Sequence, residues 1–306
     1  MSQSKPQRRL PTGKLYAIAD IHIAFPANRE AWSKLTRHPG DGLVLCGDIG
    51  ETIEHLQLAF STATRCFDTV WWCPGNHELY TLPTGSSVRG EHKYEQCVDV
   101  ARQYGVFTPE DDFIVWEGQG GPAIIAPIFT LYDYSFRPDE VTLENAVPWA
   151  REKDTEATDE FLLHPDPYPT RQDWCKILVQ KFEAKLEAAK AQHPLLPFII
   201  ANHWPLRKDL VHLKYIPRFI LWCGTTLTDN WHERFNAKVV ISGHLHIRRT
   251  DWKGGCRFEE VSLGYPRHWK DCADMDMGVN EILREILPGP ETPEGGELPT
   301  QWRRYG

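Results

Sequence analysis

Runs of aliphatic, β-branched and aromatic residues alternate with helix-like patterns along the first quarter of the chain. The runs at 15–20, 43–47 and 69–73 have the length and composition of buried strands. Between them, the segments at 27–37 and 52–66 have the polar and apolar spacing of helices that cover a sheet. Strand, helix and strand in this order predict right-handed units with parallel strands.

The alternation continues through the rest of the chain. Further predicted elements are a helix at 92–104, strands at 113–117 and 123–129, a long helix at 170–192, and strands that begin at 198 and 239. This order of elements predicts an α/β fold.

Three segments depart from this alternation. The segment 135–168 is rich in charged residues and proline, and two interpretations are open: a solvated surface insertion, or a cap over a functional site. The segment 205–228 is rich in aromatic and basic residues, and 287–306 reads as an irregular tail because proline and glycine are frequent there.

Composition narrows the class of protein. With 41% hydrophobic and 25% charged residues, the chain has enough apolar material for an ordinary globular core. No apolar run reaches the length of a membrane span and the first residues lack a secretion signal, so we expect a cytoplasmic protein without a membrane partner. The net charge of -8 makes nucleic acid an unexpected partner. None of the eight cysteines lies in a CxxC motif, which predicts reduced, packed thiols.

Five of the apolar runs are followed directly by residues of the types that bind metal ions. These residues are Asp20 and His22, Asp48, Asn76, His203, and His244 with His246. Any one alone is explained equally well by a polar strand end or a turn. Parallel strands, however, present such groups at one carboxyl edge, where carboxylates and imidazoles can hold two metals. Because residues 20 to 246 must then meet in one place, we expect one domain over 1–286.

The order of the motifs DxH, GDxxE, GNHE, NH and GHLH resembles the calcineurin-like metallophosphoesterase superfamily. The segment SLGYPR at 262–267 is similar to a Ser-Gly-Pro-Arg segment of that superfamily. The resemblance implies a four-layer α/β/β/α sandwich with two mixed sheets, in which 135–168 is a cap-like insertion.

The resemblance also implies a ligand set. Asp20, His22 and His246 would hold one metal ion, Asn76, His203 and His244 the other, and Asp48 would bridge both because a carboxylate has two oxygens. Alternating residues on extended chain would let His244 and His246 reach the two metals while Leu245 points back. Such ligands suit Mn with Fe or a second Mn, and also Zn.

The expected reaction is attack of a metal-bridging hydroxide on a phosphate ester. By resemblance, His77 contacts the phosphoryl group and protonates the leaving oxygen, and Glu51 keeps that imidazole protonated. Glu51 is equally explained as an acid at a helix N-terminus. Arg267 is a candidate phosphate contact, with a surface ion pair as the alternative.

The substrate prediction depends on residues beside the motifs. Tyr80, Trp204 and Arg207, with His212 and Lys214 in the same segment, could line an aromatic and locally basic pocket for a phosphodiester with an organic arm. The VSLGYPR ending and the tryptophan-rich middle resemble the phosphopantetheinyl hydrolases, which remove the 4'-phosphopantetheine arm from acyl or peptidyl carrier proteins. The alternatives are a nucleotide or cyclic-nucleotide phosphodiesterase, a nuclease, a general phosphatase, and a metal-free scaffold that recruits proteins.

Overall fold

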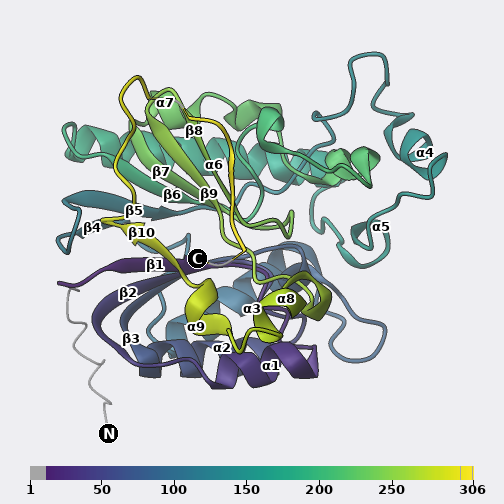
Figure 1. The fold of residues 1–306 in the computed structure, drawn as a ribbon. Coiled ribbons are helices and arrows are strands. Elements are labelled where there is room, and N and C mark those ends of the chain that lie inside the picture. Colours follow the sequence, from purple (N-terminus) through teal and green to yellow (C-terminus); the bar gives the residue numbers. More distant parts are fainter. Residues whose placement is uncertain (1–11, 297, 305) are drawn as a thin grey trace, which may run out of the picture.

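Two β-sheets pack face to face in the computed structural model, and helices cover their outer faces (Figure 1). The structure describes residues 12–296, 298–304 and 306, so the start of the predicted domain lies outside the described residues. The sheets have the strand orders β10-β1-β2-β3 and β11-β8-β9-β7-β6-β5-β4. Both contain parallel and antiparallel pairs, which confirms the predicted α/β/β/α sandwich with two mixed sheets.

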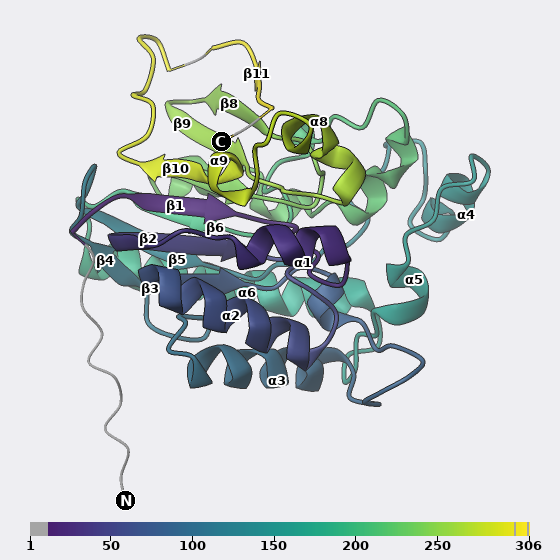
Figure 2. The ribbon, with the colours of Figure 1, turned by 60° about the horizontal axis from the view of Figure 1, so that its bottom comes forward.

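The smaller sheet has a parallel core. Its strands are β1 (Leu15–Ile18), β2 (His38–Cys46) and β3 (Phe67–Cys73), which are parallel, and β10 (Arg284–Leu287), which is antiparallel to β1. Their outer face is covered by α1 (Pro26–Ser33), α2 (Ile53–Cys66) and α3 (Gly90–Gln103), as Figure 2 shows. The predicted parallel β1, β2 and β3 are therefore confirmed.

The larger sheet is parallel in the middle and antiparallel at both edges. The parallel strands are β5 (Ala123–Pro127), β6 (Phe198–Ala201), β7 (Ala237–Ser242) and β9 (Cys256–Glu260). At the edges, β4 (Ile114–Trp116) is antiparallel to β5, β8 (Arg249–Lys253) is antiparallel to β9, and β11 (Gln301–Trp302) is antiparallel to β8. Helices α6 (Arg171–Gln192) and α7 (Trp231–Arg234) lie on its outer face in Figure 1. Two short helices, α8 (Lys270–Ala273) and α9 (Val279–Ile282), precede β10.

Side-chain alternation along the strands divides the core into layers. In β2, Val44 and Cys46 join the apolar cluster between the sheets, whereas Leu43 and Leu45 pack with the helical layer. This is the two-residue period of a strand that is buried on both faces. Each fully buried aliphatic side chain of this kind contributes roughly 1.5–3 kcal/mol through the hydrophobic effect.

Two predicted boundaries are wrong, because long-range partners override the local pattern. Helix α1 ends at Ser33 rather than at residue 37, and the backbone N–H of Thr36 donates to the Asn280 side chain at 2.9 Å instead of extending the helix. Strand β2 begins at His38 rather than at 43, since His38 already pairs with Phe67 of β3.

The C-terminal segment is more ordered than the predicted irregular tail. Strand β11 pairs with β8 through Gln301 and Trp302, and the Arg303 guanidinium donates to the carbonyl of Glu260 at 2.8 Å. Proline and glycine at 288–296 gave no local signal for this pairing, which depends on an exposed edge of β8.

The segment 135–168 contains α4 (Ala146–Arg151) and α5 (Asp159–Leu162). In both views α4 lies to the side of the sandwich (Figures 1 and 2). All eight cysteines are free and buried, as predicted. Within the described part of the chain, no helix combines the length and the apolar character needed to cross a bilayer.

Candidate metal centre

The predicted ligands converge at the carboxyl ends of five parallel strands. Asp20 and His22 follow β1, Asp48 follows β2, and Asn76 follows β3, while the three remaining histidines follow β6 and β7 of the other sheet. Six of the seven form two side-chain groups that could each hold a metal ion, with potential ligand atoms within 4.8 Å of one another. Asp48 belongs to both groups, as expected of a bridging carboxylate.

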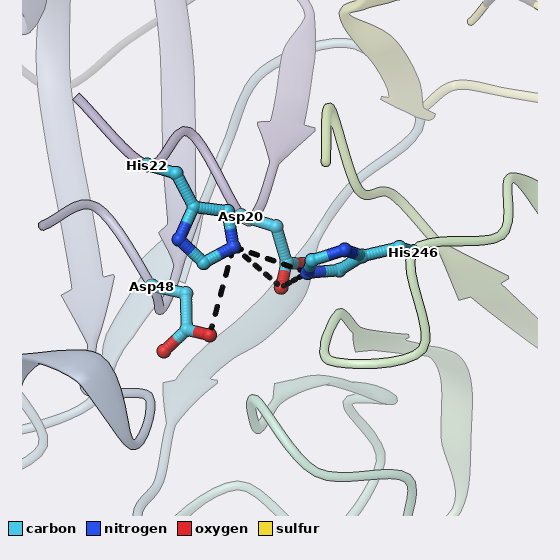
Figure 3. A group of neighbouring side chains, drawn as sticks. All are labelled: Asp20, His22, Asp48 and His246. Atoms are coloured by element: carbon cyan, nitrogen blue, oxygen red, sulfur yellow. Dashed lines mark hydrogen bonds and ion pairs between the residues drawn. The ribbon is translucent and has the colours of Figure 1, made fainter. Parts of the chain in front are cut away.

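The first group consists of Asp20, His22, Asp48 and His246 (Figure 3). The Nε2 atoms of His22 and His246 are 3.1 Å apart, and His246 Nε2 lies 3.0 Å from Asp20 Oδ1. His22 Nε2 lies 3.9 Å from Asp48 Oδ2. Four ligand atoms that face one another at such distances suit a cation among them, because hard carboxylates and imidazoles are the usual ligands of first-row metals.

The second group consists of Asp48, His203 and His244. The buried atoms His203 Nε2, His244 Nε2 and Asn76 Oδ1 have no hydrogen-bond partner among the described residues, although His203 Nε2 lies 3.4 Å from Asp48 Oδ2. Buried polar atoms without partners cost free energy, roughly 1–3 kcal/mol each. A metal ion would use these three lone pairs together, so the residues present fit the second ion.

Neighbouring groups fix the orientation of several ligands. The ring Nδ1 of His203 lies 2.9 Å from the Cys46 carbonyl, so Nδ1 donates to that carbonyl and Nε2 is the ring atom that faces the second group. Asp20 accepts from the Ser262 hydroxyl at 2.6 Å and from the His244 backbone N–H at 3.0 Å. Burial would raise the pKa of Asp48, but the adjacent imidazoles of His203 and His77 outweigh it and hold that pKa well below its usual range.

Strained backbone marks this site. The left-handed conformation occurs at five of the seven predicted ligands: Asp20 (φ 53°), His22 (φ 44°), Asp48 (φ 53°), His244 (φ 71°) and His246 (φ 55°). Such φ values are uncommon for residues other than glycine, and they concentrate at functional sites where surrounding structure holds them. The expectation that His244 and His246 alternate along extended chain is therefore wrong: β7 ends at Ser242, and both residues lie in the loop that leads to β8.

Two glycines of the motifs permit close approach of backbone to carboxylate. A Cβ atom at Gly75 would lie 2.2 Å from Asp48 Oδ1, and one at Gly243 would lie 2.4 Å from Asp20 Oδ2. Both distances are impossible for real side chains. This explains why glycine precedes the ligand residue in GNHE and in GHLH.

The predicted acid pair lies beside Asp48. His77 Nδ1 is 3.0 Å from Glu51 Oε1, and His77 Nε2 is 3.8 Å from Asp48 Oδ2. Burial lowers the pKa of His77, but the charges of Asp48 and Glu51 outweigh it and raise that pKa to about 9. The raised pKa favours the protonated imidazole, which is the state that a general acid requires.

Two predicted substrate contacts are wrong, because their side chains are buried in the core. Trp204 is 0% exposed and packs behind the ligands against His203 and His244. Tyr80 is 3% exposed, and its hydroxyl donates to Asp159 at 2.7 Å. Adjacency to a motif in sequence did not reveal which way these rings point.

The predicted basic contacts lie in different parts of the molecule. Arg207 forms an ion pair with Asp209 at 2.9 Å and lies 3.4 Å from His232, which belongs to α7 rather than to the metal-capable groups. Arg267 is exposed and lies over the ring of Tyr265, with 5.2 Å from guanidinium carbon to ring centroid. His212 and Lys214 are exposed.

Sequence reasoning missed several neighbours of the ligands. The ring of Tyr265 lies 4.5 Å from that of His22 and 4.6 Å from that of His246, between ring centroids. Phe25 lies against Tyr265, and Phe219 stacks on His244 at 5.6 Å. Tyr265 lies within the segment SLGYPR, which was a usable signal, whereas nothing in the local sequence identified Phe25 or Phe219.

Comparisons with known proteins agree with this geometry. The model of the calcineurin-like phosphoesterase family matches residues 13–248. The acyl-carrier-protein phosphodiesterase PptH of Mycobacterium tuberculosis (strain ATCC 25618 / H37Rv) is 41% identical over 284 residues, which are 92% of this chain and 85% of that protein. The crystal structure of phosphopantetheinyl hydrolase (PptH) from Mycobacterium tuberculosis superposes with a TM-score of 0.85 at 40% identity, covering 92% of this chain and 98% of that one. The chain therefore belongs to the calcineurin-like phosphoesterase family and is a metal-dependent phosphoric ester hydrolase.

Proposed function

We propose that this protein hydrolyses the phosphodiester that joins a 4'-phosphopantetheine arm to an acyl or peptidyl carrier protein. One observation carries the proposal: a relative named as an acyl-carrier-protein phosphodiesterase is 41% identical over 92% of the chain. The aligned region of 284 residues includes the segments between the motifs as well as the motifs themselves.

We assign the metal ligands as two sets that share Asp48. Asp20, His22 and His246 hold one ion, and Asn76, His203 and His244 hold the other. Mn with Fe or a second Mn is the proposed pair, with Zn as the alternative that the same nitrogen and oxygen ligands accept. When bound, two such ions supply positive charge for the phosphoryl oxygens and lower the pKa of a water molecule toward about 7.

His77 acts as the general acid that protonates the leaving oxygen of the ester. Its ring is only 13% exposed, and the hydrogen bond from its Nδ1 to Glu51 leaves Nε2 directed at the metal-capable groups. Glu51 stabilises the protonated ring, since its own pKa is lowered by the hydrogen bond to His77. The two side chains thereby hold a proton beside the site of bond breaking.

An aromatic edge, defined here as Phe25, Tyr265 and Phe219, replaces Tyr80 and Trp204 as the proposed contact for the organic arm. All three rings lie against candidate ligands, and Phe25 is 41% exposed. Arg267 beside Tyr265 is the proposed phosphate contact. Its exposed guanidinium donates one N–H, from Nε, to His268 at 3.1 Å and can direct its other N–H groups at a phosphate.

The test is a hydrolysis panel with Mn added. It compares a phosphopantetheinylated carrier protein with an aryl phosphomonoester, a cyclic nucleotide and single-stranded DNA, and mass spectrometry follows loss of the arm. We expect the highest kcat/KM on the carrier protein. Phe25→Ala should lower that value roughly two- to tenfold, the usual worth of an aromatic contact, while Phe161→Ala in α5 should not.

A preference for the nucleotide or the aryl ester would instead assign a nucleotide phosphodiesterase or a general phosphatase. In that outcome the substrate proposal fails, although the family assignment stands.

A further inference from the structure

Asp159 connects the segment 135–168 to the metal centre. Most of that segment lies at the side of the molecule in both views (Figures 1 and 2), yet Asp159, the first residue of α5, is only 1% exposed. A buried carboxylate is costly unless other groups donate hydrogen bonds to it.

Asp159 is held by two donors that come from the loop after β3. Its Oδ1 accepts from the Tyr80 hydroxyl at 2.7 Å and from Asn76 Nδ2 at 3.0 Å. Asn76 Nδ2 also donates to the Tyr80 oxygen at 2.9 Å. The three side chains therefore form a closed triangle of hydrogen bonds in the protein interior.

This triangle decides which way the Asn76 amide points. The two ends of an asparagine amide look alike in shape, but only the nitrogen can donate to a carboxylate. With both N–H groups used by Asp159 and Tyr80, Oδ1 must face the other way. That oxygen is buried and lacks a hydrogen-bond partner among the described residues, like the Nε2 atoms of His203 and His244.

The segment is fixed firmly enough to serve as a support. Leu163 forms an isolated antiparallel bridge with Tyr80, and the Thr81 N–H donates to the Leu162 carbonyl at 2.9 Å. Arg171 at the start of α6 donates to the carbonyls of Asp159 and Leu163 at 3.2 and 3.0 Å. Backbone contacts on the C-terminal side of Asp159 therefore hold α5 against the loop after β3, and the Arg171 side chain holds the carbonyls at both ends of α5.

We propose that Asp159 is a positioning residue that orients the amide of Asn76 for metal binding, so that the 135–168 segment supports the metal centre from behind. The inference rests on the proposed role of Asn76 as a ligand. Groups that orient ligands from outside the coordination sphere typically change metal affinity about 10- to 100-fold when they are removed.

The test compares Asp159→Leu, which removes the acceptor and keeps a similarly branched side chain, with Asp159→Asn, which keeps one acceptor oxygen. Asp139→Asn is the matched control, because Asp139 is an exposed aspartate in the same segment. Equilibrium dialysis measures Mn bound per chain against free Mn, and electron paramagnetic resonance separates single Mn ions from coupled pairs. Thermal melting reports whether each variant is folded.

We expect Asp159→Leu to bind its first Mn normally and its second about 10- to 100-fold more weakly, with a spectrum of single ions at intermediate Mn. Asp159→Asn should lose less, and Asp139→Asn nothing. Excess Mn should restore kcat in Asp159→Leu, since the defect is one of occupancy, whereas a general packing defect would not respond to Mn.

Normal binding of two coupled Mn ions by folded Asp159→Leu would overturn the inference. If that variant does not fold, Asp159→Asn and Tyr80→Phe decide: unchanged affinity for the second Mn in both would overturn it equally. Wild-type protein that binds fewer than two ions would instead contradict the proposed function.

Discussion

Asp48 has a different set of neighbours at each of its carboxylate oxygens. Its Oδ1 accepts from the backbone N–H of His77 at 2.9 Å, and its Oδ2 faces the rings of His22, His77 and His203 at 3.4 to 3.9 Å. Three imidazoles around one carboxylate oxygen favour the ionised form of Asp48. The negative charge on that oxygen in turn favours cations that bind to it.

The bridging role of Asp48 predicts the metal content of a variant. Asp48→Asn removes the negative charge and should reduce occupancy at both metal positions rather than at one. Elemental analysis of protein purified with Mn measures this directly, with Asp99→Asn, an exposed aspartate of α3, as the control. Two metals per chain in Asp48→Asn would refute the bridging assignment.

The acid role of His77 predicts a dependence on the leaving group. His77→Ala should keep both metals and lose roughly 10²- to 10⁴-fold in rate, the usual contribution of general acid catalysis. The loss should shrink for aryl esters, whose leaving oxygens need less protonation. The measurement is kcat on alkyl and aryl esters, with His92→Ala, an exposed histidine, as the control. An equal loss on both classes would indicate positioning of substrate instead.

At the scale of elements, the candidate ligands lie in loops that follow the strands, and contacts with the sheets fix the conformation of these loops. Asp20 is linked in this way to the C-terminal strands, because the Ser262 hydroxyl donates to Asp20 and its oxygen also lies within hydrogen-bond distance of the Glu260 carboxyl group of β9. The neighbouring Glu259 is 0% exposed and forms ion pairs with Arg257, Arg284 and Arg303, of which the last follows β11. The C-terminal segment is thus connected to the layer behind the metal centre.

This connection predicts that the C-terminal segment stabilises the fold. Arg303→Met should lower the free energy of unfolding by about 1–3 kcal/mol, because it removes one charged partner of the buried Glu259 and the donor to the Glu260 carbonyl. Urea denaturation measures the change, and Arg304→Met, whose side chain is exposed, is the control. Equal stability of the two variants would show that the pairing with Glu259 contributes nothing.

At the scale of the whole molecule, the metal centre joins the two sheets. Residues that follow β1, β2 and β3 come from the smaller sheet, and those that follow β6 and β7 come from the larger. A ligand that binds only the folded state stabilises it in proportion to its occupancy. Metal ions at this junction should therefore stabilise the packing of one sheet on the other.

Removal of metal should consequently lower the melting temperature of the whole domain. Free Mn at about 100 times its dissociation constant should stabilise the folded state by roughly 2.7 kcal/mol for each site. Differential scanning calorimetry with EDTA, and then with Mn restored, measures the shift. Asp48→Asn should show little shift under the same conditions, and an unchanged melting temperature in wild-type protein would contradict the junction model.

The sequence by itself predicted the class of fold and identified the candidate ligands. Apolar runs that end in Asp20, Asp48, His203 and similar residues are local patterns, and their repetition at strand ends requires a shared edge. The pairing of Glu51 with His77 was expected from the resemblance to the calcineurin-like family. The strand ends and the candidate ligands depend on residue type and spacing, which a linear chain displays.

Tertiary structure alone decided what surrounds the ligands. Packing between segments far apart in sequence buries Trp204 and Tyr80 and brings Asp159 to Asn76. It also holds the left-handed backbone at His244 and His246. The pairing of β11 with β8 depends on a free strand edge, which no property of residues 287–306 reveals. A side chain's direction follows from the neighbours that exclude its other rotamers, and the fold is what supplies those neighbours.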